Sequence, residues 1–318
     1  MTTTEDRPAA SSRAAASPRA ATATADALAD GLRRAGVPVD VTSHRRAEYA
    51  SDASLYRLVP QAVAFPRTTD EVLAAVDTCR ALGVPVTPRG AGTSIAGNAI
   101  GRGLVVDFAR HLNRVLDLDP EAATAMVQPG VVLDALQAQA RPHGLRFGPD
   151  PSTHNRCTLG GMIGNNACGS RSLGYGRTAD NVLAQRVVTG TGERLTAVAG
   201  ADPASSPTLT ALHEVVTDEL ATIRTESGRF RRQVSGYSLE HLLPERRFDV
   251  ASALVGSEGT LGVLLDATVR LARAPRTTVL VALGYPDMVA AGRAAPALRR
   301  ARTTSTIRAS MPSTAAGA

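Results

Sequence analysis

Apolar positions recur at two spacings along the chain, which predicts a domain that mixes helices with short strands. Apolar runs of strand length lie at 62–65, 84–88, 104–108, 114–119 and 123–130. Between the first two runs, apolar residues recur at the spacing of one helical face, at Val72, Val76, Cys79 and Leu82. Thr68 and Glu71 form a capping-box pattern, and Gly83 stands where a helix commonly ends. We therefore expect a strand–helix–strand unit over residues 62–88.

The second half of the chain shows the same mixture. Leu133, Leu136 and Ala140 predict a helix that ends near Gly144. The pattern further predicts a hairpin at 181–195, one long amphipathic helix at 209–223, a short helix at 236–243, and a strand, glycine turn and strand at 253–271. Two segments, 88–98 and 147–170, follow neither period, so we expect loops there.

Composition narrows the class of protein. The 318 residues, 43% of them hydrophobic, suffice for one large or two ordinary domains, and no apolar run approaches the length of a membrane span. The net charge of +6 comes from arginine alone, because the chain has no lysine, which excludes a P-loop and a lysine Schiff base. With 3% aromatic residues and scattered arginines, nucleic-acid binding is disfavoured.

The cysteines indicate the compartment. Cys79, Cys157 and Cys168 are an odd number and form no C-x-x-C motif, so we expect no disulfide framework. A cytoplasmic location fits best, with attachment to the membrane surface as the alternative.

The first irregular segment, P-R-G-A-G-T-S-I-A-G-N at 88–98, carries candidate chemistry. Its glycines allow positive φ and close backbone approach, and successive free N–H groups form a concavity that suits phosphate oxygens. Arg89, Thr93 and Ser94 add a charge and two hydroxyl donors. The segment therefore predicts a pyrophosphate site, with a plain surface turn as the alternative. A Rossmann fingerprint is disfavoured, because the spacing is G-x-G-x-x-x-x-G and a strand follows.

Two more glycine-rich segments make one extended ligand the better interpretation. The motif P-D-P-S-x(4)-C-T-x-G-G-x-x-x-N-N-x-x-G occupies 149–169, and G-S-E-G-T-L-G occupies 256–262. Hydroxyls, amides and backbone N–H groups at such short range suit a polar heterocycle. The nucleophile elbow G-x-S-x-G is absent, and the six histidines have no metal-ligand spacing.

The order of the three motifs resembles the FAD-linked oxidases of the vanillyl-alcohol oxidase (PCMH-type) family. The similar branch contains D-lactate dehydrogenases, glycolate oxidase subunits and D-2-hydroxyglutarate dehydrogenases. The resemblance implies an α+β fold, with a PCMH-type FAD-binding domain of two α+β subdomains and only the start of a C-terminal cap domain. We expect tails at 1–25 and 301–318, the domain at 26–275 with subdomains at about 49–130 and 131–275, and the start of the cap at 276–300.

The resemblance also implies the cofactor site. Residues 89–94 would hold the pyrophosphate, 152–165 would line the ribityl and isoalloxazine, and the 258–263 turn would lie by the adenine. The residues expected to bind FAD are Arg89, Gly90, Ala91, Gly92, Thr93, Ser94, Gly97, Asn98, Pro151, Ser152, Thr158, Gly160, Gly161, Gly164, Asn165, Gly169, Glu258, Gly259, Gly262 and Val263. The first loop has no histidine for covalent attachment, so noncovalent FAD is implied, with attack by Cys157 as the alternative.

The chain departs from the family in its last part. Relatives continue into a cap that supplies the catalytic histidine, a carboxylate-binding arginine and often a metal motif, none of which appears here. Residues 277–300 look like the first strand and helix of that cap, and we favour a truncated or frame-shifted product. Two functions therefore stay open. One is an FAD-dependent dehydrogenase of small D-2-hydroxy acids, with an electron-acceptor partner or a complementary subunit. The other is a flavin-binding remnant without a complete substrate site. No catalytic residue is assigned.

Overall fold

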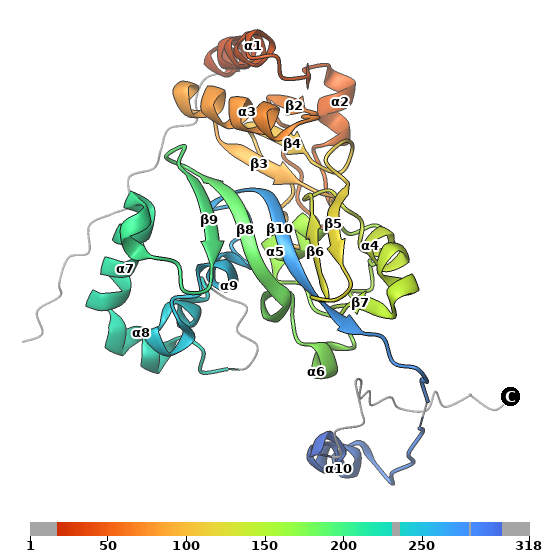
Figure 1. Cartoon of the computed structure of the whole chain (residues 1–318). Coiled ribbons are helices and arrows are strands. Elements are labelled where there is room, and N and C mark those ends of the chain that lie inside the picture. Colours follow the sequence, from red (N-terminus) through yellow and green to blue (C-terminus); the bar gives the residue numbers. More distant parts are fainter. Residues whose placement is uncertain (1–17, 231–235, 280, 301–318) are drawn as a thin grey trace, which may run out of the picture.

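Two sheets and the helices around them make up the fold (Figure 1). The structure is a computed structural model and describes residues 18–230, 236–279 and 281–300. The first sheet has the order β1-β2-β4-β3, in which β2 and β3 run parallel to β4 and β1 runs antiparallel to β2. Its elements, in chain order, are α1 (Pro18–Arg34), β1 (Val39–Asp40), α2 (Ser43–Glu48), β2 (Ala62–Ala64), α3 (Thr69–Leu82), β3 (Val86–Arg89) and β4 (Leu104–Asp107).

The expected strand–helix–strand unit is confirmed by β2, α3 and β3. Thr68 caps α3, because its side chain accepts a hydrogen bond from the N–H of Glu71 at 3.2 Å. Gly83 ends the helix in the left-handed conformation, with φ of 64°. The apolar face of α3 packs with α1 and β4 in a core that also contains Val188 and Val263 from the second sheet. The two sheets therefore share a core and are held in a fixed relation.

The second sheet is antiparallel and is built around its longest strand, β10 (Gly262–Arg273). The strand order is β5-β6-β10-β8-β9, and β7 pairs with the end of β10. The other strands are β5 (Val115–Asp119), β6 (Thr124–Val127), β7 (Leu145–Phe147), β8 (Val182–Thr189) and β9 (Arg194–Val198). The hairpin expected at 181–195 is β8 and β9, whose pairing joins Val188 to Arg194.

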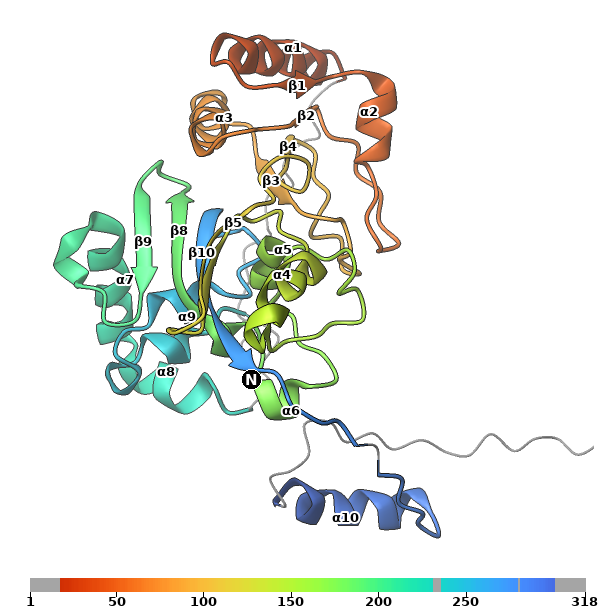
Figure 2. The ribbon, with the colours of Figure 1, turned by 45° about the vertical axis from the view of Figure 1, so that its right-hand side comes forward.

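Two groups of helices pack against this sheet (Figure 2). One core joins α4 and α5 to β6, β7 and β10, and another joins α7, α8 and α9 to β8 and β9. The helices of this part of the chain are α4 (Leu133–Ala140), α5 (Leu159–Asn165), α6 (Ser172–Tyr175), α7 (Pro207–Asp218), α8 (Leu220–Glu226), α9 (Val250–Leu254) and α10 (Met288–Arg300). Of these, α10 lies apart from both sheets (Figure 1). Single 3-10 turns lie at Arg141–His143, Ala179–Asn181, Pro203–Ser205, Leu239–Leu242 and Pro244–Arg246.

Several segments differ from their predicted form. The long helix at 209–223 is broken at Glu219 into α7 and α8, and the short helix at 236–243 is a 3-10 turn. The strand expected from residue 253 is the end of α9, so only its partner after the glycine turn, β10, is a strand. The 147–170 segment is not all loop, because Thr158 caps α5 within it.

The expected boundaries also shift. β6 pairs with β10 and β5 pairs with β6, so the chain passes from one sheet to the other between β4 and β5, before the boundary expected near residue 130. Residues 18–25 begin α1 rather than a tail, while 1–17 and 301–318 lie outside the described residues. The helix expected in 276–300 is α10, but the described residues of 277–283 form no strand, and Val279 and Val281 lie exposed without a sheet partner. Residues 231–235 of the arginine-containing segment 229–237 lie outside the described residues.

Candidate functional site

The three glycine-rich segments converge on one cavity of about 740 Å³. It is bounded by the loop after β3, the segment that contains α5, and the turn that leads into β10. Its volume lies within the roughly 300–1,000 Å³ of small-molecule sites. Segments far apart in the sequence thus form one site, as their glycine content predicted.

Arg89, at the start of the first loop, contacts the backbone on either side of that loop. Its Nη1 donates to the carbonyls of Ser51 and Ala99, at 2.9 and 3.0 Å, and its guanidinium lies 5.0 Å from the centre of the Tyr49 ring. Burial lowers the pKa of this guanidinium, and the nearby Tyr49 and Asp107 oppose that shift. We expected Arg89 to offer its charge to a phosphate; in the structure its Nη1 instead donates to the carbonyls of Ser51 and Ala99, which lie outside the 88–98 segment. Arg89 therefore positions the loop.

The backbone of this loop leaves a run of donors unused. From Gly90 to Ile95, no backbone N–H donates to an acceptor in the part of the chain that the structure describes. All six residues line the cavity. Ser94 accepts from the N–H of Ala96 at 3.3 Å, which leaves its hydroxyl proton to donate. Successive unused N–H groups are what an anion-binding concavity of the predicted kind would require.

Two glycines are required by contacts between protein segments. A Cβ on Gly90 would lie 2.1 Å from Oγ1 of Thr158, and a Cβ on Gly160 would lie 2.7 Å from Cβ of Pro129. The Oγ1 of Thr158 accepts from the N–H of Gly161 at 3.2 Å and so caps α5. The first loop thus rests directly on the start of α5, which brings the first two segments together.

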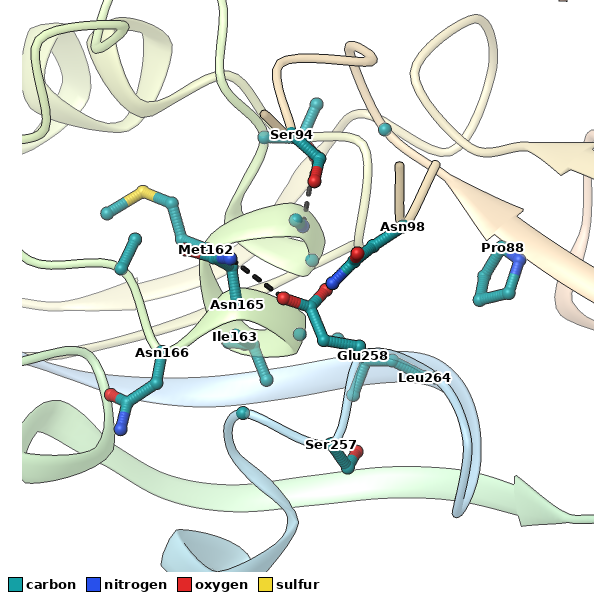
Figure 3. A pocket seen from close by; sticks show the side chains of 18 of the residues that line it. Pro88, Ser94, Asn98, Met162, Ile163, Asn165, Asn166, Ser257, Glu258 and Leu264 are labelled. Carbon is teal, nitrogen blue, oxygen red and sulfur yellow. Dashed lines mark hydrogen bonds between the residues drawn. The ribbon is translucent and has the colours of Figure 1, made fainter. Parts of the chain in front are cut away.

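Glu258 joins the three segments (Figure 3). Nδ2 of Asn165 on α5 donates to its Oε1 at 2.7 Å, and the side chain of Asn98 in the first loop also hydrogen-bonds to it. The N–H of Glu258 donates to the carbonyl of Gly164 at 3.0 Å, and its φ is 53°. Burial raises the pKa of its carboxyl, although both amides oppose that shift.

Most predicted residues line the cavity, and four do not: Gly97, Ser152, Gly169 and Val263. Gly97 faces the ring of Tyr56, and Gly169 packs on the carbonyl of Asp150, where a Cβ would lie 2.0 Å from the oxygen. Val263 is buried in the core between the sheets, because adjacent strand residues face opposite sides and Gly262 takes the cavity side. Gly97 and Gly169 therefore serve the packing of protein segments.

Other lining residues were missed, among them Phe108, Cys168, Arg177, Gln185, Tyr237 and Leu264. Gln185 is buried on β8, and its Nε2 donates to the carbonyl of Ala251 at 2.6 Å. An amide between Ala184 and Arg186 in a strand rich in apolar residues was a signal that could have pointed to it.

The ionisable groups at the cavity limit its chemistry. In the described chain no histidine lines the cavity, and no group of three residues could hold a metal ion. His154, the histidine of the second glycine-rich segment, pairs with Asp134 at 2.9 Å and does not line the large cavity. Burial raises the pKa of the Cys157 thiol, which keeps it protonated and weakly nucleophilic.

Comparison with known proteins identifies the class to which this site belongs. Residues 60–197 match the family model of the FAD binding domain. The fold is similar to that of solved structures such as the carbohydrate oxidase from Microdochium nivale, with a TM-score of 0.56, 19% identity, and coverage of 78% of this chain and 44% of that one. Residues 60–197 therefore form an FAD binding domain, which indicates FAD as the cofactor.

The chain is also similar in sequence to proteins of known activity. The chain is 37% identical over 286 residues to D-2-hydroxyglutarate dehydrogenase of Pseudomonas putida, covering 85% of this chain and 28% of that protein. It is 34% identical to glycolate oxidase subunit GlcD of Bacillus subtilis, covering 80% of this chain and 46% of the subunit. The chain thus spans between a quarter and a half of these relatives. The described residues include no helix long and apolar enough to cross a membrane.

Proposed function

We propose that the chain binds FAD noncovalently in the large cavity, with the pyrophosphate on the loop from Gly90 to Ile95. The unused N–H groups of this loop carry the proposal, since they have no acceptor within the described chain and successive free N–H groups suit phosphate oxygens. The hydroxyls of Thr93 and Ser94 line the same wall and add donors. The hydrogen bonds of Asn98 and Asn165 to Glu258 hold the three glycine-rich segments together at the cavity.

We infer the noncovalent link from the lack of a lining histidine and from the state of Cys157; Cys168 also lines the cavity, and acid release of the flavin tests it. The described lining offers no histidine, and the Cys157 thiol is only 5% exposed, with its pKa raised by burial. A protonated, enclosed thiol is a poor nucleophile toward an isoalloxazine ring.

We infer that the protein takes part in the oxidation of small D-2-hydroxy acids. The named relatives act on D-2-hydroxyglutarate, glycolate and D-lactate, which share a hydroxyl beside a carboxylate. FAD would supply the hydride acceptor. The residues of this chain would hold that cofactor and exclude water from one side of it, while a base and a carboxylate site would come from elsewhere.

Partners and location follow from the same inference. Glycolate oxidase GlcD is named a subunit, which supports a complementary subunit or an electron-acceptor protein as partner. The free cysteines Cys79, Cys157 and Cys168 support a cytoplasmic location, with membrane-surface attachment as the alternative.

Purification and titration with FAD test the proposal. The protein should be yellow or take up added FAD, and acid should release all the flavin. Thr93→Val should weaken FAD binding about tenfold, since a hydrogen bond to a charged group contributes roughly 1.5–3 kcal/mol. Thr196→Val, at an exposed position of β9, is the matched control and should bind FAD as the wild type does. Folded protein that takes up no FAD would refute the proposal.

A further inference from the structure

A second cavity, of about 310 Å³, lies on the other side of the segment that follows β7. It is enclosed by α4, by β7 and by the Asp150–His154 turn, and three arginines line it: Arg141, Arg146 and Arg171. Two aspartates, Asp134 and Asp150, are the carboxylates of its wall. Positive groups therefore outnumber negative ones in this small volume.

Both aspartates already have partners. Nδ1 of His154 lies 2.9 Å from Oδ1 and 3.0 Å from Oδ2 of Asp134. Nε of Arg171 lies 3.1 Å from Oδ2 of Asp150, and the N–H of Arg171 donates to Oδ1 of the same carboxylate at 3.0 Å. The carboxylates are thus engaged at the wall of the cavity and leave the other cations uncompensated.

Arg146 and Arg141 are those cations. Nε of Arg146 is buried and has no hydrogen-bond partner, although its guanidinium lies over the Tyr175 ring, 5.4 Å from the ring centre. Arg141 forms no ion pair with any described residue. Gln137 cannot serve as their acceptor, because its amide bonds to both the N–H and the carbonyl of Phe147, at 3.1 and 2.9 Å. Because this Nε is closed to solvent, a ligand in the cavity would meet the outer nitrogens of the two guanidinium groups, which have no carboxylate partner among the described residues.

We propose that this cavity binds a small oxyanion, whose oxygens accept hydrogen bonds from Arg146 and Arg141. Arginine's planar set of donors fits a phosphate or carboxylate group, and the ring of Tyr175 holds the Arg146 guanidinium in place. The limited volume favours a ligand the size of phosphate or a small dicarboxylate.

This site is separate from the large cavity but shares a wall with it. Asp150 and His154 face the small cavity, while Pro151, Thr153 and Cys157 of the same segment line the large one. The oxyanion site does not depend on the proposed FAD site, and the two can be tested apart.

Titration of the full chain with inorganic phosphate, followed by calorimetry and by the Nε–Hε resonances of arginine, tests the proposal. Phosphate should bind saturably and should shift the Arg146 resonance, which the spectrum of Arg146→Gln identifies. Changing Arg141 and Arg146 together to Gln should weaken phosphate binding at least about tenfold, because charge-assisted hydrogen bonds are lost. The matched control changes Arg194 and Arg270, two exposed arginines of the second sheet, to Gln and should leave the affinity unaltered. Malonate in place of phosphate shows which oxyanion is preferred.

Three results would overturn the proposal. Phosphate could bind the doubly changed protein as tightly as the wild type. The Arg146 resonance of the wild type could stay unchanged under saturating phosphate and malonate, a result that decides the matter even if the variant fails to fold. Saturating FAD could abolish phosphate binding, which would place the phosphate in the large cavity.

Discussion

Gly92 offers the sharpest test of how the first loop is built, through the substitution Gly92→Ala. Its φ is 66°, and an added Cβ would lie 2.5 Å from Nη2 of Arg89. The left-handed backbone would cost an alanine about 1–2 kcal/mol. The contact would also displace a guanidinium that holds the carbonyls of Ser51 and Ala99, and losing one such bond costs about 1.5–3 kcal/mol.

Gly83→Ala separates these two costs. Gly83 has φ of 64°, and a Cβ there would meet no atom within 4 Å. Both variants should therefore lose the same backbone term in urea unfolding. Only Gly92→Ala should move Arg89, distort the donors at Gly90–Ile95 and weaken FAD binding, by about ten- to a hundredfold if 1.5–3 kcal/mol is lost.

Fluorescence titration of FAD with both variants provides the measurement, and circular dichroism confirms that each is folded. If Gly92→Ala binds FAD as tightly as Gly83→Ala, Arg89 does not organise the cofactor loop, and the phosphate site lies elsewhere.

Three further predictions follow from the same contacts. Gly90→Ala places a Cβ 2.1 Å from Oγ1 of Thr158 and should lower the free energy of unfolding by about 1–3 kcal/mol; adding Thr158→Ala should cost less than the sum of the single changes, and additive costs would argue against this contact. Burial raises the pKa of Glu258 above 4.5, so its contribution to stability is full below about pH 4.5 and is lost as the pH rises through the raised value. Glu258→Gln should flatten that part of the urea-measured pH profile, and an unchanged profile would mean that the carboxylate is not desolvated. The isolated chain, loaded with FAD and mixed anaerobically with D-lactate, glycolate or D-2-hydroxyglutarate, should reduce flavin very slowly, because no histidine among the described lining residues can take the hydroxyl proton; rapid bleaching would show a substrate site within this chain.

Local sequence signals predicted the local structure well. The Thr68 cap, the apolar face of α3 and the Gly83 stop lie within one helix, so their interactions are readable from spacing alone. The β8–β9 hairpin is equally local. The cavity-lining role of the glycine-rich loops was also visible, because so many unconstrained residues in a row have no use in a helix or a strand.

Contacts between distant segments were beyond sequence reasoning. β5 and β6 join the second sheet because β10, more than a hundred residues later, pairs with β6. Capping of α5 by Thr158 was hidden in a glycine-rich run whose helix propensity is low, and packing on β10 compensates for that.

The sequence by itself therefore determined which segments form the site and what class of ligand they suit, because glycine, hydroxyl and amide groups carry that chemistry wherever they are placed. Only the tertiary structure decided what each residue does there. Arg89 donates to the carbonyls of Ser51 and Ala99, Gly90 leaves space for Thr158, and Val263 lies in the core. Each of these outcomes depends on a partner brought close by the two sheets, and the direction of a side chain is set by the atoms around it rather than by its neighbours in the chain.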